Sequence, residues 1–199
     1  MAAMKDILPE LNGLDYIEKL QEDYELRFCR VDEREQLVEF LREYWRKDHI
    51  FVLRPDLLDW QHLDRKNNRY NYVVAQNRKS GEFHSVLGFI PTSHYDDQIA
   101  QTEIWTSTWR SRPDIHVKGL GVGLYYYVKT AIPLDAITLL GISQSTLGIY
   151  KRWHFQVGKM KHYYILNDAI KDFRLVKNIQ DMYTSGHEDA DSAKSLERC

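Results

Sequence analysis

The sequence predicts a mixed α/β domain with a mostly antiparallel sheet and helices on both faces. Three strand-like runs follow one another in the middle of the chain, as in an antiparallel meander. A strand, helix, strand unit comes after them and adds a crossover connection. The length of 199 residues suits one domain of ordinary size.

The region before the meander begins with a strand and a helix. Residues 25–31 alternate charged and apolar side chains, as strands do. Asp32 and Glu35 have the spacing of a capping box, so a helix is expected to begin there. Its apolar face should pack against the sheet and consists of Leu37, Val38, Phe40, Leu41, Tyr44 and Trp45. Residues 46–69 should form short helical or irregular pieces around Pro55.

The meander and the crossover unit complete the predicted order. We expect strands at 70–75, 85–90 and 102–109, a helix at 124–132, a buried strand at 136–143, a helix at 145–155 and a last strand at 158–166. Turn residues between the first two strands predict a β-hairpin, and Pro133 should end the first of these helices. Residues 1–23 are predicted to be a partly helical extension, 24–167 the domain, and 168–199 a C-terminal segment with a mobile polar tail.

Composition excludes several classes of protein. The 27 basic and 29 acidic residues give a formal charge of −2, which does not favour a nucleic-acid partner. Cys29 and Cys199 are the two cysteines, so a disulfide framework is not expected and a reducing compartment, the cytoplasm, is favoured. Neither a signal peptide nor a membrane span is indicated, so no membrane partner is expected.

Residues 118–124 contain the most specific motif of the chain. Gly119, Gly121 and Gly123 alternate where a helix is expected to begin, so backbone N–H groups should be exposed at the positive end of a helix dipole. A P-loop is excluded because Leu124 and three tyrosines follow the last glycine instead of Lys and Ser or Thr. The dinucleotide-binding glycine spacing is also absent. A phosphate-binding turn remains, with a plain strand-to-helix turn as the alternative.

The order of elements and a second motif resemble the GNAT superfamily of acyl-CoA-dependent N-acyltransferases. Lys118, Gly121 and Gly123 match its basic-x-x-Gly-x-Gly turn, and Tyr150 and Phe155 keep the spacing of a Tyr and a Phe in a later helix. The sequence departs from the usual pattern at four positions, which are Lys118 for Arg or Gln, Ser143 for Asn, Thr146 for Ala, and His154 for Gly. The resemblance covers residues 24–166.

This resemblance implies acetyl-CoA as co-substrate, no metal, and a primary amine of a small molecule as acceptor. The pyrophosphate would bind at Lys118, Gly119, Leu120, Gly121, Val122, Gly123 and Leu124. The pantetheine arm would pair like an extra strand beside Trp109, Arg110 and Ser111. The resemblance also implies Tyr150 as the acid that protonates the leaving thiolate and Glu103 as the base that deprotonates the amine.

A narrower similarity concerns the acceptor. Segments such as Trp60-Gln61, Tyr70-Asn71 and residues 87–91 resemble acetyltransferase domains encoded with bacterial surface-polysaccharide genes, which implies a nucleotide-linked amino sugar. Two alternatives stay open, a non-catalytic acyl-CoA-binding module and an acetyltransferase acting on protein Lys or N-termini. The oligomeric state also stays open, with a homodimer as one option.

Overall fold

The computed structural model describes residues 13–144 and 146–159. Its helices and strands, in chain order, are α1 (Gly13–Gln21), β1 (Tyr24–Arg30), η2 (Val31–Glu33), α2 (Arg34–Tyr44), α3 (Ile50–Leu53), α4 (Pro55–His62), β2 (Leu63–Asp64), β3 (Arg69–Asn77), β4 (Phe83–Pro91), η3 (Thr92–His94), β5 (Glu103–Ser111), α5 (Leu120–Ala131), β6 (Ala136–Leu139) and α6 (Leu147–Arg152). The chain divides into two compact units, 1–148 and 149–199, which are described separately.

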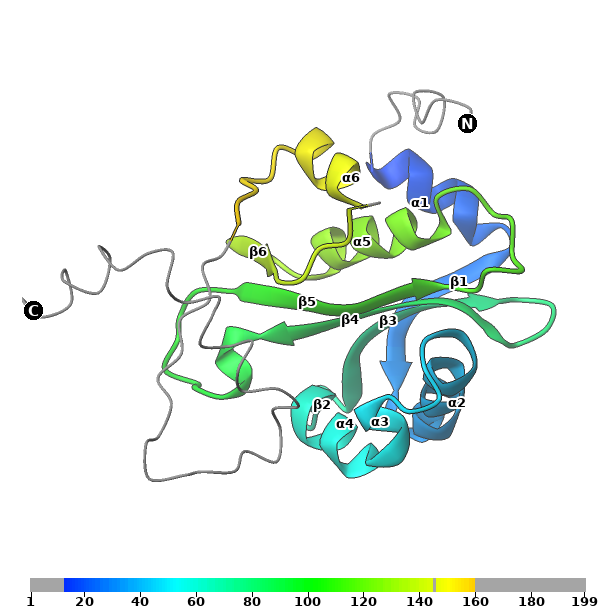
Figure 1. The fold of residues 1–199 in the computed structure, drawn as a ribbon, viewed down its shortest axis with the longest axis horizontal. Coiled ribbons are helices and arrows are strands. Elements are labelled where there is room, and N and C mark those ends of the chain that lie inside the picture. The colour runs from blue at the N-terminus through cyan, green and yellow to red at the C-terminus, as the bar shows by residue number, and fades with distance from the viewer. Residues whose placement is uncertain (1–12, 145, 160–199) are drawn as a thin grey trace, which may run out of the picture. The chain divides into compact units, whose positions relative to one another are not determined.

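The first unit contains a six-stranded sheet in the order β1-β3-β4-β5-β6, with β2 also paired to β3. Its strand pairs are antiparallel except β5 and β6, which are parallel and joined by the crossover helix α5. Helices α1 and α5 cover one face, and α2, α3 and α4 cover the other (Figure 1). The predicted mixed α/β class and the helices on both faces are confirmed.

The core under α2, α3 and α4 explains why these residues form an amphipathic layer. Leu37, Phe40 and Leu41 are buried against Tyr72 and Val74 of β3. Burying a large apolar side chain contributes about 1.5–3 kcal/mol, so this seam fixes α2 on the sheet. Trp45, predicted to lie on the same face, is instead 39% exposed because α2 ends at Tyr44 and the chain turns away.

The predicted capping box is wrong. Helix α2 begins at Arg34 after a short 3-10 turn, so Asp32 and Glu35 are not in cap positions. The carboxylate of Glu33 caps the 3-10 turn instead, because it accepts a hydrogen bond from the backbone N–H of Arg30. It also forms ion pairs with Arg27 and Arg30. Burial of Glu33 among two guanidinium groups overrides the local spacing signal.

Two element boundaries also differ from the sequence prediction. Helix α5 begins at Leu120 rather than at residue 124, so Gly121 and Gly123 lie inside the helix. Strand β6 is four residues long and half-buried, shorter and more exposed than predicted. The strand predicted at 158–166 lies almost entirely outside the described residues, and the predicted tail lies wholly outside them. No helix among the described residues is long and apolar enough to cross a bilayer.

Candidate functional site

Strands β5 and β6 run side by side for a short distance only. They pair from Glu103 with Ala136 to Thr106 with Leu139. Within the described part of the chain, no strand pairs with residues 107–111 on that side of β5. The backbone N–H and C=O groups along this edge are therefore available to an extended ligand.

A β-bulge lies where this open edge begins. The register between β4 and β5 shifts between Leu87 and Phe89, so Ser107 and Thr108 together face Gly88. A side chain at position 88 would come within 2.6 Å of both the Ser107 hydroxyl and the Tyr72 ring. The one sequence signal that could have revealed the bulge is a glycine in an otherwise apolar strand.

The glycine motif forms the turn into α5. Gly119 is the residue before the helix and has φ = 76°, a left-handed conformation that favours glycine. Gly121 and Val122, in the first turn, donate no backbone hydrogen bond to any residue of the described chain. The Gly123 N–H already donates to the Gly119 carbonyl at 2.9 Å, so that amide is committed to the helix. Available donors are thus concentrated at Gly121 and Val122.

The structure brings the first helical turn against the end of β5. A Cβ at Gly121 would lie 2.8 Å from the indole Nε1 of Trp109 and 3.2 Å from the hydroxyl of Ser111. The Ser111 hydroxyl is held by the Ser85 hydroxyl at 2.7 Å, which fixes the end of the strand. The end of β5 and the glycine turn, which the sequence analysis both assigned to acetyl-CoA, are therefore neighbours.

Arg110, the third β5 residue assigned to that ligand, lies elsewhere. Alternate side chains of a strand point to opposite faces, and the Arg110 Nε donates to the Tyr44 carbonyl at 2.7 Å, on the side of α2. The structure does not bring its side chain to the glycine turn. Lys118 is exposed just before the turn.

Gly123 has a structural role that the sequence did not suggest. A Cβ at this position would collide with the Leu20 side chain of α1, because the two helices are in close contact. Leu124 is fully buried on the same helix. Residues 123 and 124 thus pack on the inner side of α5, and their side-chain positions do not face the turn.

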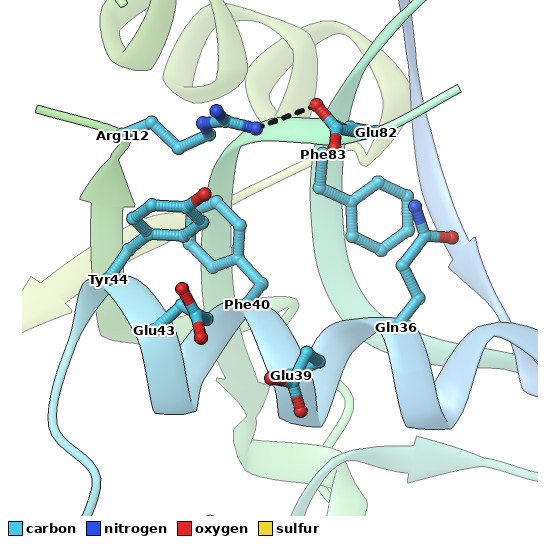
Figure 2. Close-up of a pocket in the computed structure, with 8 residues that line it drawn as sticks. All are labelled: Gln36, Glu39, Phe40, Glu43, Tyr44, Glu82, Phe83 and Arg112. Atoms are coloured by element: carbon cyan, nitrogen blue, oxygen red, sulfur yellow. Dashed lines mark hydrogen bonds and ion pairs between the residues drawn. The ribbon is translucent and has the colours of Figure 1, made fainter. Parts of the chain in front are cut away.

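A polar anchor holds the segment that connects β5 to the turn. The Arg112 backbone N–H donates to the His84 carbonyl at 2.9 Å, and its guanidinium pairs with Glu82 and Asp114 at 2.8 and 2.7 Å. The guanidinium lies 4.9 Å from the centre of the Tyr44 ring. Both residues line a cavity of about 270 Å³, and Figure 2 shows the guanidinium above this ring. Arg112 therefore restrains the start of this connection.

Glu103 is the first residue of β5 and pairs with Ala136, at the closed end of the strand pair. It lies four residues before the bulge, a separation of roughly 13 Å along a strand. Its backbone carbonyl accepts a hydrogen bond from the Thr92 hydroxyl at 3.4 Å. The structure does not bring Glu103 to the point where β5 and β6 separate.

Tyr150 belongs to the second unit and lies in α6. It is 4% exposed, and its ring meets those of Trp153 and Phe155 edge-on at 6.0 and 5.4 Å. Burial raises the pKa of the phenol to about 12, so it stays protonated at neutral pH and can act as a proton donor. His154, where the resembled family usually has Gly, has φ = 61°, which accounts for a glycine preference at that position.

No protein-family model and no curated protein sequence matches the chain. Solved structures do match its fold. A possible acetyltransferase from Clostridium difficile 630 has a TM-score of 0.53 and 14% identity, over 73% of this chain and 99% of its own. An acetyltransferase from Trypanosoma brucei has a TM-score of 0.50 and 16% identity, over 72% of this chain and 100% of its own.

A third match carries a bound compound. AAC(6')-Iy, in complex with the bisubstrate analogue CoA-S-monomethyl-acetylneamine, has a TM-score of 0.50 and 9% identity, over 72% of this chain and 98% of its own. At such identities the likeness shows the fold alone. The chain therefore has the fold of the GNAT acetyltransferases, as its sequence predicted.

Proposed function

We propose that this protein is an N-acetyltransferase that moves an acetyl group from acetyl-CoA to a primary amine of a small polar acceptor. The observation that carries the proposal is the contact of Gly121 with Trp109 and Ser111. It brings together two amides of a helix N-terminus and a strand edge, neither of which is paired within the described chain. The helix N-terminus suits the diphosphate of CoA, and the strand edge suits its amide-bearing pantetheine arm.

The proposed donor site depends on glycine at position 121. The space beside Trp109 would be filled by any side chain at position 121, so glycine leaves the backbone open there. The proposed pyrophosphate donors are the amides of Gly121 and Val122, with exposed Lys118 supplying a charge-assisted contact. The proposed pantetheine edge is 107–111, after the bulge.

In the proposed reaction the neutral amine attacks the thioester carbonyl, a C–N bond forms and the C–S bond breaks. The Tyr150 phenol gives its proton to the departing thiolate, whose pKa should be about 8.5, as for a cysteine thiol. The proton from the amine goes to a base. We assign Glu103 this role through intervening water, because its distance from the bulge excludes direct contact at that point.

For the acceptor we propose an amino sugar, including one linked to a nucleotide. The support is the similarity of Trp60-Gln61 and Tyr70-Asn71 to surface-polysaccharide acetyltransferases. A structure with this fold holds an analogue that joins CoA to an acetylneamine, so the fold can accommodate both parts at once. Proteins that acetylate Lys or N-termini, and modules that only bind CoA, are the competing functions.

Thiol release from acetyl-CoA tests these functions directly. The full chain should release CoA thiol with glucosamine or a nucleotide-linked amino sugar, and mass spectrometry should find the acceptor heavier by one acetyl group. Binding of acetyl-CoA without turnover for any amine would contradict catalysis and leave the binding module. Turnover with Lys peptides but with no small amine would instead identify a protein-directed enzyme.

A further inference from the structure

A second cavity, of about 610 Å³, lies at the other end of the sheet from the glycine turn. Pairing between β3 and β4 ends at Tyr72 with Gly88, and the start of β3 pairs with β2 instead. The cavity opens at this fork, and its walls come from α4, β2, β3 and the chain after β4. From Ser85, which pairs with Ser111, to Pro91 in the cavity wall is roughly 20 Å along β4.

The wall contains a buried acceptor with no donor. Asn71 is 1% exposed, and its side-chain Oδ1 has no hydrogen-bond partner within the described chain. A buried oxygen left without a donor destabilises the folded state, so such atoms are rare in native structures. Asn71 is among the residues that line the cavity, and a ligand whose O–H or N–H group reaches this oxygen would satisfy it.

The side chain of His62 lies at the place where β3 and β4 separate. His62 is fully buried, and its Nδ1 lies 3.1 Å from the Phe89 carbonyl of β4. Its ring packs edge-on against Phe51 at 5.4 Å and Tyr72 at 4.7 Å. Because these partners are core residues, the geometry around Asn71 is set before any ligand arrives.

An aromatic platform stands at the mouth of the cavity. Trp60 lines it and is 63% exposed, and the Tyr95 ring lies 5.3 Å away at a tilt of 40°. His94 holds the pair, with its Nε2 3.0 Å from the Trp60 carbonyl and its ring 4.8 Å from that of Tyr95. Large apolar ring faces kept exposed beside polar groups suit a ligand with one apolar face and a polar edge.

Charges around the cavity are mixed and nearly balanced. Asp59 is committed to Arg34 through two hydrogen bonds of 2.9 Å, and Asp64 accepts from Asn67. The other charged residues of the lining are Arg65, Lys66 and Asp97. This balance gives neither a phosphate nor a polyamine a strong electrostatic advantage, and it favours a neutral ligand with hydroxyl groups.

We propose that this cavity is a saccharide-binding site, in which a sugar ring stacks on Trp60 and one hydroxyl donates to the Oδ1 of Asn71. Pro91 of the cavity wall pairs with Ile104, next to the proposed base Glu103. Trp60 and Asn71 belong to the segments that support the proposed amino-sugar acceptor, so the site rests on the proposed function and names where that sugar would bind. Sugar binding without acetyl transfer would support the site and contradict only the proposed function.

NMR titration of the full chain without CoA tests the site, with glucose, galactose and N-acetylglucosamine as probes and with AMP and spermine as representatives of other classes. At least one sugar should bind saturably, and Trp60→Ala should weaken that binding about tenfold. The control Trp45→Ala, which removes a part-exposed Trp outside the cavity, should bind as wild type does.

Asn71→Leu provides a second test. It removes an unsatisfied oxygen without changing the side-chain size greatly, so the variant should melt at or above the wild-type temperature and lose sugar binding. If Asn71→Leu does not fold, Trp60→Ala alone decides. No sugar binding up to about 50 mM, binding of AMP or spermine instead, or sugar binding unchanged in Trp60→Ala would each overturn the proposal.

Discussion

Gly121 lies directly against Trp109, so that a single added methyl group would come within 2.8 Å of the indole nitrogen. This contact places the α5 N-terminus beside the edge of β5, at amides and strand residues that have no backbone partner in the described part of the chain. In a phosphate-binding turn, glycine is required where the backbone must approach another group closely. Here the neighbouring group is Trp109 of the protein itself, and the absence of a side chain at position 121 leaves room for it.

Gly121→Ala should therefore weaken acetyl-CoA binding more than it weakens the fold. The new methyl group must displace Trp109 or the first turn of α5, which carries the proposed phosphate donors. We expect the KM for acetyl-CoA to rise about tenfold or more, with a stability loss near 1 kcal/mol. Steady-state kinetics and thermal melting measure the two effects.

Gly158→Ala is the matched control, because a Cβ there would meet no atom of the described residues within 4 Å. Its KM for acetyl-CoA and its melting temperature should match those of wild type. An unchanged KM in Gly121→Ala would show that the turn does not bind the donor.

Gly123→Ala should have the opposite balance, a loss of stability with little direct effect on the donor site. Its Cβ would collide with the side chain of Leu20, a residue of α1 that is 8% exposed. Overpacking of this kind costs about 1–3 kcal/mol. Chemical denaturation should show that Leu20→Ala partly rescues the variant, since the smaller side chain makes room. Strictly additive losses in the double variant would rule out this contact as the cause.

Tyr150→Phe tests the proposed acid. The ring packing against Phe155 is retained, so the fold should be unaffected while kcat falls about a hundredfold. Since burial holds the phenol pKa near 12, wild-type activity should show no loss from deprotonation of this group at neutral or mildly alkaline pH. Tyr126→Phe, on α5, is the matched control and should keep the wild-type kcat. A full kcat in Tyr150→Phe would exclude the phenol as the donor.

His62 predicts a loss of stability in mild acid. Burial lowers its pKa to about 4, whereas in the unfolded chain its pKa should be about 6.5. Between these values the unfolded state binds more protons, so the free energy of unfolding should fall as the pH drops from 6.5 toward 4. Urea denaturation at pH 7 and pH 5 measures the difference.

His62→Gln should reduce that difference between pH 7 and pH 5, because glutamine does not titrate. Burial also lowers the pKa values of His49 and His84, so a smaller slope of the same sign should remain. A variant with the full wild-type slope would show that His62 is not the responsible group. Only the slopes are compared, since loss of the ring contacts with Phe51 and Tyr72 will itself lower stability.

Much of the fold could be predicted because its signals are local. The apolar spacing in α2, the alternation before it, and the turn residues between β3 and β4 each depend on a few neighbouring residues. The boundaries were less predictable. The Glu33 carboxylate caps the 3-10 turn before α2 and is surrounded by Arg27 and Arg30, an arrangement that depends on how β1 meets this turn.

The sequence by itself determined the fold class, the position of the glycine turn, and the Tyr150 and Phe155 pair. Each of these follows from the spacing of residues within short segments. Only the tertiary structure decided the rest. Gly121 faces Trp109 of β5 while Gly123 faces Leu20 of α1, and Arg110 turns to the other side of the sheet. Asn71, at the fork of β3 and β4, has no donor for its side-chain oxygen among the described residues. These outcomes depend on register and packing between segments distant in sequence, which no local pattern encodes.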